Sequence, residues 1–376
     1  MRLFVPRETR NGERRAALVP DVVTKLVRLG ADVTFEPDLG AGCHLADGAF
    51  RNAGGRPLPR EQGLAEADLV LRINKPPTDE IPRMKRGAIH ISFLDPFREP
   101  DLVRALMTAR ITALSLELIP RTTLAQKMDA LSSQSSLAGY VAVLMAAERL
   151  PRIFPMMMTP AGTLAPSLVF VIGAGVAGLQ AIATARRLGA RVEAFDTRPV
   201  VEEQVKSLGA RFVKVDLGET GQTKDGYARA LTEEQMQKQR EAMAKHCAQA
   251  DVVITTAQVF GRKAPLIITA DMVRGMKPGS VIVDMAVESG GNVEGSRLDE
   301  EVDAGGVTIL GHANLPARVP AHASQMIASN LGHLVEHGWN TGTKAFEPRM
   351  DDEILRGSLV TRGGEIVNEM VKQRMQ

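Results

Sequence analysis

Cysteine is scarce in this sequence, and its scarcity excludes two ways of holding a fold together. The 376 residues include two cysteines, Cys43 and Cys247, which lie far apart and in no metal-like spacing. We therefore expect no structural disulfide, no metal site and a reducing compartment.

An excess of one charge and a long apolar run are missing as well. The formal net charge is +2, so the overall charge indicates neither nucleic acid nor anionic lipid as a partner. The opening MRLFVPRETR carries charge and proline where a signal peptide has its apolar core. No window of about 18 residues is uninterruptedly apolar, as a membrane-spanning helix requires. With 44% hydrophobic and 24% charged residues, the chain has the profile of a soluble globular protein.

The sequence does contain a regular alternation of short apolar runs and helix-like stretches. The first series of runs is RLFVP, ADVTFE, ADLVLRIN and GAIHISF, and a second series starts near residue 167 with SLVFVIG, RVEAFDT, ADVVITTA and KPGSVIVDMA. This alternation predicts an α/β protein with two Rossmann-like domains and parallel sheets, the second a dinucleotide-binding domain.

Two apolar stretches, residues 136–150 and 321–339, are predicted as long helices that join the domains. Residues 341–376 are polar and helix-like and lack strand material, and we expect them to return to the first domain. The predicted first domain therefore comprises residues 1–131 plus 325–376, and the dinucleotide-binding domain comprises residues 132–324.

The strongest motif is VFVIGAGVAGLQAIATARRLGARVEAFDTR. Gly173, Gly175 and Gly178 form G-x-G-x-x-G between a predicted strand, 168–172, and a predicted helix, 176–188. The first glycine permits a tight turn, the second lets backbone N–H groups approach a pyrophosphate, and the third lets helix and strand pack closely. The helix N-terminus, which begins at Val176, adds positive potential for the phosphates.

The next predicted strand ends at Asp196, eighteen residues after Gly178. At this place a carboxylate would hydrogen-bond the adenosine ribose hydroxyls and repel a 2′-phosphate, which predicts NAD(H) rather than NADP(H). Arg198 favours the opposite preference, NADP(H), because its guanidinium could meet that phosphate. Asp196, however, lies where the ribose is expected. Thr197 is included among the predicted cofactor contacts.

Residues 121–140, RTTLAQKMDALSSQSSLAGY, concentrate hydrogen-bonding groups. If the segment is helical, Gln126, Asp129 and Ser132 share one face and could bind a carboxamide or a ribose. Arg121 could pair with Asp129 or with a phosphate. The residues alone leave a second interpretation open, in which Asp129 or Ser132 only caps the apolar helix that follows.

A long stretch beginning LGETGQTKDGYAR separates the strands RFVKVD and ADVVITTA and becomes a charged helix. It holds Tyr227, one of two tyrosines, and is either a functional loop or a disordered insertion. The run Met156–Met158 is interpreted as packing rather than chemistry.

Together the motifs resemble the NAD(H)-binding component of the proton-translocating NAD(P) transhydrogenases, which is the first part of their α subunit. The likeness covers nearly the whole chain and includes PRTTLAQKMDALSSQSSLAGYVAV, FPMMMTPAGT, GVAGLQAIATARRLGA, KPGSVIVDMAVESGGN and GHANLPARVP. The resemblance implies a catalytic group around the nicotinamide that consists of Gln126, Arg121, Asp129 and Ser132. It also implies cofactor contacts at Lys127, Met128, Gly226, Tyr227, Gln239 and Gln258, with Gly226 and Tyr227 in a loop that closes over the nucleotide.

The fold also resembles alanine dehydrogenase, in which an Arg, a Lys, a His and an Asp bind the small substrate. This sequence keeps Arg15 and Lys75 but has Asp95 at the histidine position and Glu288 at the aspartate position. Amine oxidation needs an acid–base group that titrates near neutral pH, and an aspartate with a reference pKa of about 4 does not supply it.

Other histidines could in principle replace the missing one, among them His90, His312 and His322, but no spacing argument favours any of them. Arg15 and Lys75 are therefore expected to stabilise the domain rather than to bind substrate.

We predict an NAD(H)-binding subunit that passes a hydride directly to NADP⁺ on a partner, with an amino-acid dehydrogenase and a non-catalytic NAD-binding module as alternatives. The resemblance implies that two partners, the second part of the transhydrogenase α subunit and the β subunit, provide the membrane and NADP(H) functions. It further implies a homodimer of this component, coupling to proton translocation, and a cytoplasmic position, peripheral on the inner membrane through the partners. No nucleic-acid partner is expected.

Overall fold

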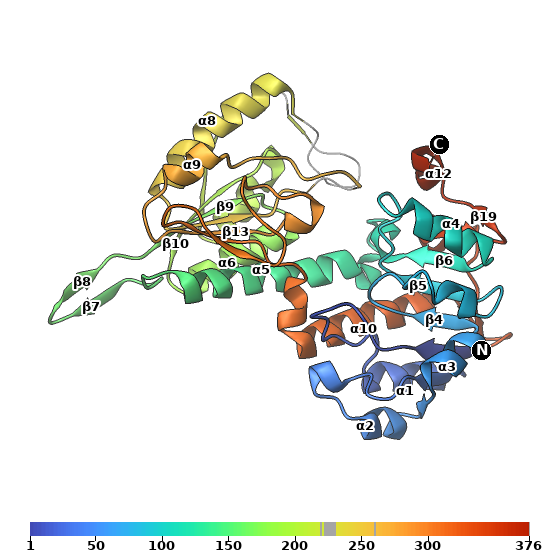
Figure 1. The fold of residues 1–376 in the computed structure, drawn as a ribbon. Coiled ribbons are helices and arrows are strands. Elements are labelled where there is room, and N and C mark those ends of the chain that lie inside the picture. Colours follow the sequence, from blue (N-terminus) through green and yellow to red (C-terminus); the bar gives the residue numbers. More distant parts are fainter. Residues whose placement is uncertain (219, 222–230, 259–260, 376) are drawn as a thin grey trace. The chain divides into compact units, whose positions relative to one another are not determined.

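The chain forms two compact units. A computed structural model describes residues 1–218, 220–221, 231–258 and 261–375. One unit combines Met1–Gln134 with Ala317–Gln376, and the other is Ser135–Pro316 (Figure 1). The domain limits predicted from the sequence fall inside helices α5 (Ala130–Arg149) and α10 (Pro320–His337), and as limits of functional domains they stay a prediction.

An eight-stranded sheet organises the first unit. The strands β1 to β6 pair in parallel, whereas β18 and β19 run antiparallel at one edge. Fully buried apolar strands such as Leu69–Leu71 are typical of a parallel sheet covered on both faces. The spatial order is β19 (Glu365–Ile366), β18 (Leu359–Arg362), β6 (Thr112–Ser115), β5 (Ile89–Ser92), β4 (Leu69–Leu71), β1 (Arg2–Val5), β2 (Asp32–Phe35) and β3 (Arg56–Pro57).

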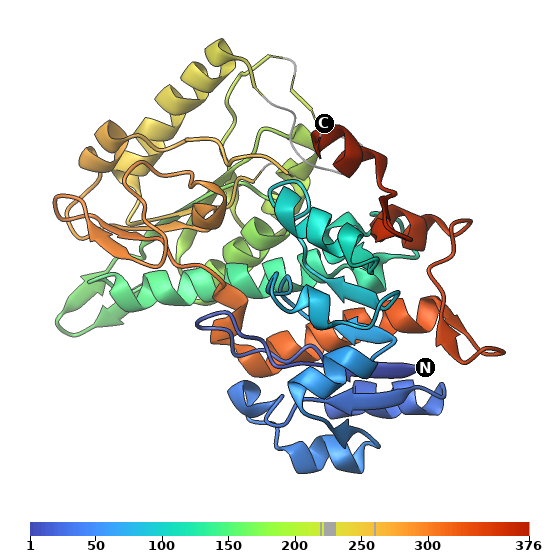
Figure 2. The same cartoon turned by 45° about the vertical axis from the view of Figure 1, so that its right-hand side comes forward.

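The strands in the C-terminal segment correct one expectation. Leu359 of β18 lies opposite Leu114 of β6, so the segment extends the first sheet. Figures 1 and 2 show this red segment beside the teal β6 and α4 (Pro100–Thr108). The prediction that the tail lacks strand material was wrong, because two- to four-residue edge strands are too short to give a periodic pattern.

Helix α10 supplies much of the core of the first unit. Its Ile327, Leu331 and Leu334 are fully buried in the same cluster as Leu69 and Leu71 of the sheet. The other helices of this unit are α1 (Pro20–Arg28), α2 (Asp47–Asn52), α3 (Arg60–Glu66), α11 (Glu353–Ser358) and α12 (Glu369–Met375). Short 3₁₀ turns occur at η1 (Ala41–Cys43), η2 (Ile81–Arg83), η3 (Leu116–Leu118) and η4 (Gln126–Met128), and β16 (Trp339–Asn340) pairs with β17 (Ala345–Phe346).

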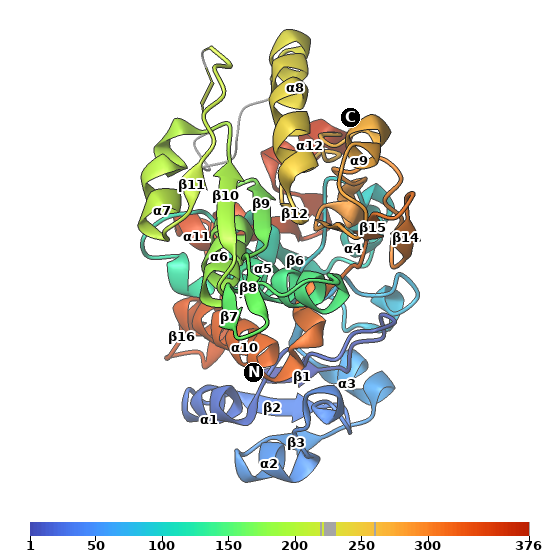
Figure 3. The ribbon, with the colours of Figure 1, turned by 90° about the vertical axis from the view of Figure 1, so that its left-hand side faces the viewer.

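A seven-stranded sheet organises the second unit (Figure 3). Its order is β11 (Arg211–Phe212), β10 (Arg191–Phe195), β9 (Leu168–Ile172), β12 (Val252–Thr255), β13 (Val281–Asp284), β15 (Thr308–Leu310) and β14 (Glu301–Asp303), parallel except for β14. The strand order reverses between β9 and β12, and ligands of open α/β sheets bind at the carboxyl ends of the strands beside such a reversal. The predicted α/β class with two Rossmann-like, largely parallel sheets is confirmed.

Helices cover the second sheet as the alternation of strands and helices predicts. Residues Met243 and Cys247 of α8 pack in one core with Phe170 and Ile172 of β9. Burial raises the pKa of the Cys247 thiol to about 12. The helices of this unit are α6 (Val176–Arg187), α7 (Glu202–Ser207), α8 (Glu233–Gln249) and α9 (Ala270–Arg274), with 3₁₀ turns η5 (Pro199–Val201), η6 (Val287–Ser289) and η7 (Leu315–Arg318) at the end of the unit.

A two-stranded hairpin projects from the second unit. Its strands, β7 (Met157–Thr159) and β8 (Gly162–Leu164), are antiparallel and exposed at every residue (Figure 1). The side chains of Met156 and Met158 are 59% and 73% exposed. The interpretation of the methionine run as packing is therefore wrong within this chain.

Helix α5 is long and apolar enough to cross a membrane by length and composition. Such a feature is weak evidence for a span, since the core helix of a globular protein meets the same criterion. Burial explains part of the apolar character here: Ala130 and Ala142 are fully buried, and a side chain on Gly139 would collide with the Ala177 carbonyl oxygen at 2.1 Å.

Candidate functional site

The turn between β9 and α6 has the geometry of a pyrophosphate site. Gly173 has φ +99°, a conformation that favours glycine, and a Cβ at Gly178 would lie 1.8 Å from the Gly173 carbonyl oxygen. A Cβ at Gly175 would meet only the Arg198 guanidinium, at 3.9 Å. Gly175 is the N-cap of α6 and gives no side-chain cap, which leaves the first N–H groups of the helix for a ligand. Val176, the first helical residue, is 42% exposed although it is apolar.

Asp196 follows the end of β10 and is engaged on both carboxylate oxygens. Its Oδ2 accepts hydrogen bonds from Ala174 N (2.7 Å) and Arg198 Nη2 (2.8 Å), and its Oδ1 accepts from Arg198 N (2.8 Å) and Nε (2.9 Å). The carboxylate therefore ties the glycine turn to the loop after β10. Thr197, between the pair, accepts a hydrogen bond from Thr220 through its carbonyl oxygen.

The strand on the other side of the order reversal supports the same turn. After β12, Thr256 donates a hydrogen bond to the Gly173 carbonyl oxygen at 3.0 Å. Gln258 follows two residues later, is exposed, and donates to the carbonyl oxygen of Met285 at 3.2 Å. The structure thus brings the predicted contact Gln258 to the sheet edge that carries the glycine turn.

Asn292 fixes the loop that carries Gln258, although no sequence motif singled it out. Its Nδ2 donates to the carbonyl oxygens of Ala257 (2.9 Å) and Pro265 (2.8 Å), and its Oδ1 accepts from Ala257 N (3.1 Å). Asp284, at the end of β13, accepts from Asn292 N in turn. A polar residue at the carboxyl end of a buried strand, as in VIVD, was the available signal for this network.

The polar segment in the first unit is not one continuous helix. Gln126 belongs to the 3₁₀ turn η4, Asp129 has ψ 87°, and α5 begins only at Ala130. The condition under which Gln126, Asp129 and Ser132 would share a helical face is therefore not met. Asp129 accepts hydrogen bonds from Ser132 N (2.9 Å) and Ser132 Oγ (2.6 Å), as an N-cap does, and an N-cap residue has non-helical dihedrals.

Helix α10 holds this segment in place. Asn330 donates to the Lys127 carbonyl oxygen at 2.9 Å and accepts from Ser133 Oγ at 2.7 Å. Met128 is fully buried in the core, so only its backbone could meet a ligand, whereas Gln126 and Lys127 are exposed. Arg121 is exposed as well. The buried Met128 and the Asn330 hydrogen bonds leave Gln126 on the surface of an anchored turn.

Of the three remaining predicted contacts, Gln239 lies within the described residues. Gln239 is on α8 and is 8% exposed. Gly226 and Tyr227 lie outside the described residues. Thr232 begins the helix with a capping box, since its hydroxyl accepts from Gln235 N and the Gln235 side chain accepts from Thr232 N.

The residues that match the substrate groups of alanine dehydrogenase are engaged within the first unit. Arg15 is buried, pairs with Glu13 at 2.6 Å and donates to Gln134 at 2.8 Å. Burial raises the pKa of the Glu13 carboxyl, but the hydrogen bonds and charge of Arg15 outweigh it and bring the pKa to about 2.

The other positions of this group are engaged too. Lys75 pairs with Glu99. Asp95, at the position of the missing histidine, pairs with Arg98 at 2.7 Å. Glu288 is exposed and accepts a hydrogen bond from Asn314 N.

The candidate substitute histidines differ in their surroundings. His90 is fully buried, and burial together with the charge of Arg72 lowers its pKa to about 3. His312 forms a hydrogen bond with Glu301, and both residues belong to the second unit. His322 lies in the first turn of α10 and is exposed. Within the part of the chain that the structure describes, no group of three His, Cys, Asp or Glu residues could hold a metal ion.

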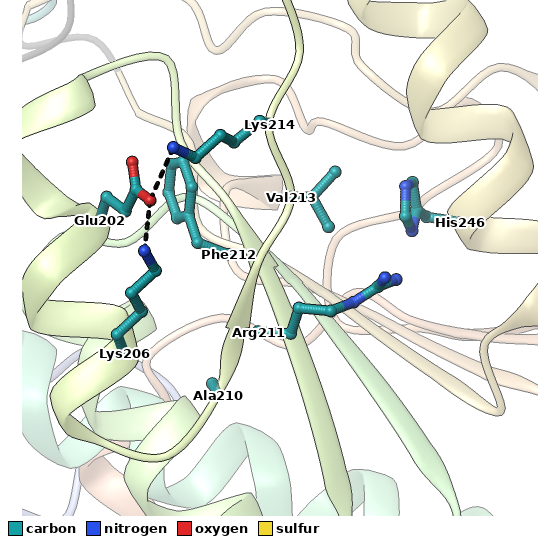
Figure 4. A pocket seen from close by; sticks show the side chains of 8 residues that line it. All are labelled: Glu202, Lys206, Ala210, Arg211, Phe212, Val213, Lys214 and His246. Atoms are coloured by element: carbon teal, nitrogen blue, oxygen red, sulfur yellow. Dashed lines mark ion pairs between the residues drawn. The ribbon is translucent and has the colours of Figure 1, made fainter.

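A hollow of about 460 Å³ lies beside the edge strand β11 (Figure 4), and its lining includes no residue of the glycine turn. Its basic residues face glutamates: Lys206 and Lys214 both pair with Glu202, while Arg211 and His246 both contact Glu193. It is lined by Glu202, Lys206, Ala210, Arg211, Phe212, Val213, Lys214 and His246, none of them a predicted site residue. The internal ion pairs neutralise much of its charge.

Comparison with known proteins matches the chain from near its start to near its end. The family model described as "Alanine dehydrogenase/PNT, N-terminal domain" matches residues 4–138, and the corresponding C-terminal domain model matches residues 142–369.

Individual relatives divide between two names. The first part of the NAD(P) transhydrogenase subunit alpha of Rhodospirillum rubrum is 46% identical, over 98% of each chain. The alanine dehydrogenase of Mycobacterium tuberculosis is 30% identical, over 99% of this chain and 96% of its own length. Among solved structures, a transhydrogenase from Sinorhizobium meliloti superposes with a TM-score of 0.88 at 42% identity, over 97% of this chain and all of the other.

Proposed function

Because this chain belongs to the alanine dehydrogenase/PNT family, we propose that it is the NAD(H)-binding subunit of a proton-translocating transhydrogenase. In this role it binds NAD(H) and takes part in direct hydride transfer to NADP⁺ held on a partner subunit. The alternative within the family is an alanine dehydrogenase that reduces NAD⁺ with its own small substrate.

One observation carries the choice between these two reactions. The position that needs a titrating imidazole holds Asp95, which is paired with Arg98, and Arg15 is buried between Glu13 and Gln134. The buried imidazole of His90 stays neutral down to about pH 3, since burial lowers its pKa, and it has no access to solvent. At these positions an amine oxidation would find an arginine that is already paired and an aspartate in place of the imidazole. Hydride transfer between two nicotinamides needs neither a substrate-binding arginine nor an acid–base group.

The residues of the chain then act by positioning. When bound, the nicotinamide of NADH supplies a hydride, that is, a proton together with two electrons. Only C–H bonds break and form. Effective transfer requires donor and acceptor carbons about 3–3.5 Å apart. The glycine turn and the N-terminus of α6 would hold the pyrophosphate and Asp196 the adenosine ribose. Gln126, with Arg121, Asp129 and Ser132, would orient the nicotinamide end.

The remaining aspects of the proposal concern assembly. The partners, the second part of the α subunit and the β subunit, would hold NADP(H), carry the membrane spans and couple hydride transfer to proton translocation. This subunit would then be peripheral on the cytoplasmic side through those partners. We also propose a homodimer, since the exposed hairpin of β7 and β8 carries Met156, Met158 and Leu164, apolar side chains that water disfavours.

The test is stopped-flow hydride transfer from NADH to a thio-analogue of NADP⁺, with and without an isolated NADP(H)-binding partner of known competence. Fast transfer only with the partner supports the proposal. Binding of NADH without transfer would overturn it and leave a non-catalytic NAD-binding module. Reduction of NAD⁺ by L-alanine without any partner would establish the alternative.

A substitution at Gln126 tests the positioning role. Gln126→Asn shortens the side chain by one methylene, and a shift of about 1 Å in a reacting geometry can cost roughly 100-fold in rate. We expect hydride transfer to fall by about that factor while NADH affinity changes far less, as measured by the same stopped-flow assay and by equilibrium binding. Equal losses in rate and affinity would contradict it.

A further inference from the structure

The ion pair between Asp196 and Arg198 raises a question about how the ribose reaches its carboxylate. Four N–H groups already donate to Asp196, three of them from Arg198. A carboxylate has about four lone-pair sites. The Asp196 side chain is only 6% exposed, and the Arg198 side chain is 14% exposed. Hydroxyl groups of a ribose can therefore bond Asp196 only if the guanidinium gives up part of its contact.

The same guanidinium lies next to the place where the phosphates of a dinucleotide are expected. Its Nη2 lies 3.9 Å from where a Cβ on Gly175 would be, beside the glycine turn. A planar guanidinium binds phosphate oxygens through two parallel hydrogen bonds as well as it binds a carboxylate. An arginine near the ribose is also what accommodates a 2′-phosphate in NADP(H)-binding sheets of this kind.

We propose that Arg198 is a specificity-determining residue whose phosphate affinity is masked by Asp196. While the carboxylate is present, it repels a 2′-phosphate and also neutralises the Arg198 guanidinium that could bind it. Without that carboxylate, Arg198 turns the adenosine end of the site into a 2′-phosphate site. The inference rests on the proposed function, because it presupposes that NAD(H) binds at this turn.

The experiment is a double-mutant cycle on the full chain, with dissociation constants for NADH and NADPH measured for each protein. Asp196→Asn keeps an oxygen that can accept from Ala174 N but no longer pairs with Arg198. We expect NADPH to bind at least tenfold more tightly to it than to the unmodified chain, and NADH more weakly. Arg198→Ala should move the NADH-to-NADPH preference the other way, since the negative charge is then uncompensated.

The double variant decides the matter. Asp196→Asn with Arg198→Ala should lose most of the gain in NADPH affinity, and Asp196→Asn with Arg198→Lys should keep part of it, in a salt-sensitive way. Arg211, which pairs with Glu193 at the amino end of β11, is the matched control, and Arg211→Ala should leave the preference unchanged. Asp196→Ala serves in place of the Asn variant if that protein does not fold.

Two failures are distinguishable. If the unmodified chain binds no NADH, the proposed function fails. If NADH binds as expected but the double variant binds NADPH as tightly as Asp196→Asn alone, Arg198 has no masked phosphate affinity and this inference is overturned.

Discussion

His90 is a single residue whose burial makes the stability of the first unit depend on pH. It is fully buried on β5, its Nε2 lies 3.0 Å from Ser92 Oγ, and its Nδ1 has no partner among the described residues. Burial, and to a smaller extent the charge of Arg72, lowers the pKa of the ring to about 3. The folded state therefore keeps this imidazole neutral at pH values where the unfolded chain protonates it.

The sign of the effect follows from the lowered pKa. Between about pH 6.5 and pH 3 the unfolded state binds one more proton than the folded state, so stability falls as the pH falls, by about 1.4 kcal/mol per pH unit at most. From pH 7 to pH 5, His90 should cost about 2 kcal/mol, and His90→Gln should remove that share. Urea unfolding followed by Trp339, the single tryptophan and a core residue of this unit, measures it. Equal acid sensitivity of both proteins would show that His90 does not carry the effect.

The sequence showed the residues around Asp196 but not how they bond to one another. The strand-end position of Asp196 and the nearby Arg198 were both visible, and Asp196 was placed at the ribose while Arg198 was a group that could meet a 2′-phosphate. The structure shows them bonded to each other, an arrangement that depends on backbone dihedrals after β10 rather than on residue types. Asn292 was missed for a related reason. Its hydrogen-bond partners are distant from it in the sequence or lie in irregular backbone.

At the scale of elements, the start of α5 has an observed role as a helix cap and a proposed role in orienting the nicotinamide, and a variant can separate the two. Asp129 caps the helix, and loss of an N-cap costs about 1 kcal/mol. Asp129→Asn keeps a capping oxygen but removes the charge, while Asp129→Ala removes both. We expect Asp129→Asn to retain the free energy of unfolding within about 0.5 kcal/mol and still to slow hydride transfer at least tenfold, whereas Asp129→Ala should lower both.

Another capping aspartate in the same unit provides the control. Asp352 caps α11 through Ile354 N and Leu355 N and has no predicted role in binding. Asp352→Asn should leave the rate of hydride transfer unchanged. Full activity of Asp129→Asn would instead reduce Asp129 to a helix cap, the interpretation that the residues alone had left open.

Elements with continuous apolar character were the predictable ones. β9 was predicted at its observed bounds, because five buried apolar residues precede a glycine turn that ends the strand. Gln126, Asp129 and Ser132 do not share a helical face. Their spacing continues across the helix cap, but the backbone before the cap is not α-helical. The strands β7, β8, β18 and β19, of two to four residues each, were not predicted.

At the scale of the whole molecule, the exposed hairpin predicts self-association. Replacing Met156, Met158 and Leu164 by serine removes most of its exposed apolar surface without touching either large sheet. We expect the mass measured by sedimentation to fall from a dimer to a monomer, because burial of such side chains contributes about 1.5–3 kcal/mol each. Leu298, which is also exposed in the second unit, is the control, and Leu298→Ser should leave the mass unchanged. A triple variant with the unmodified mass would rule out the hairpin as the interface.

The pairing of β18 with β6 also determines the order in which the two sheets can be completed during synthesis. The sheet of the second unit has all its strands once residue 310 has been made, so it can be complete while translation continues. β6, made much earlier, keeps an open edge until residues 359–366 leave the ribosome. Throughout that interval the nascent chain presents one unpaired edge of β6, a template for wrong pairing, and α10, which fills the same core, is completed only at residue 337. Of the two units, the one whose first strands are made earlier is thus finished later, and this is the stage at which a holding chaperone would have most to protect.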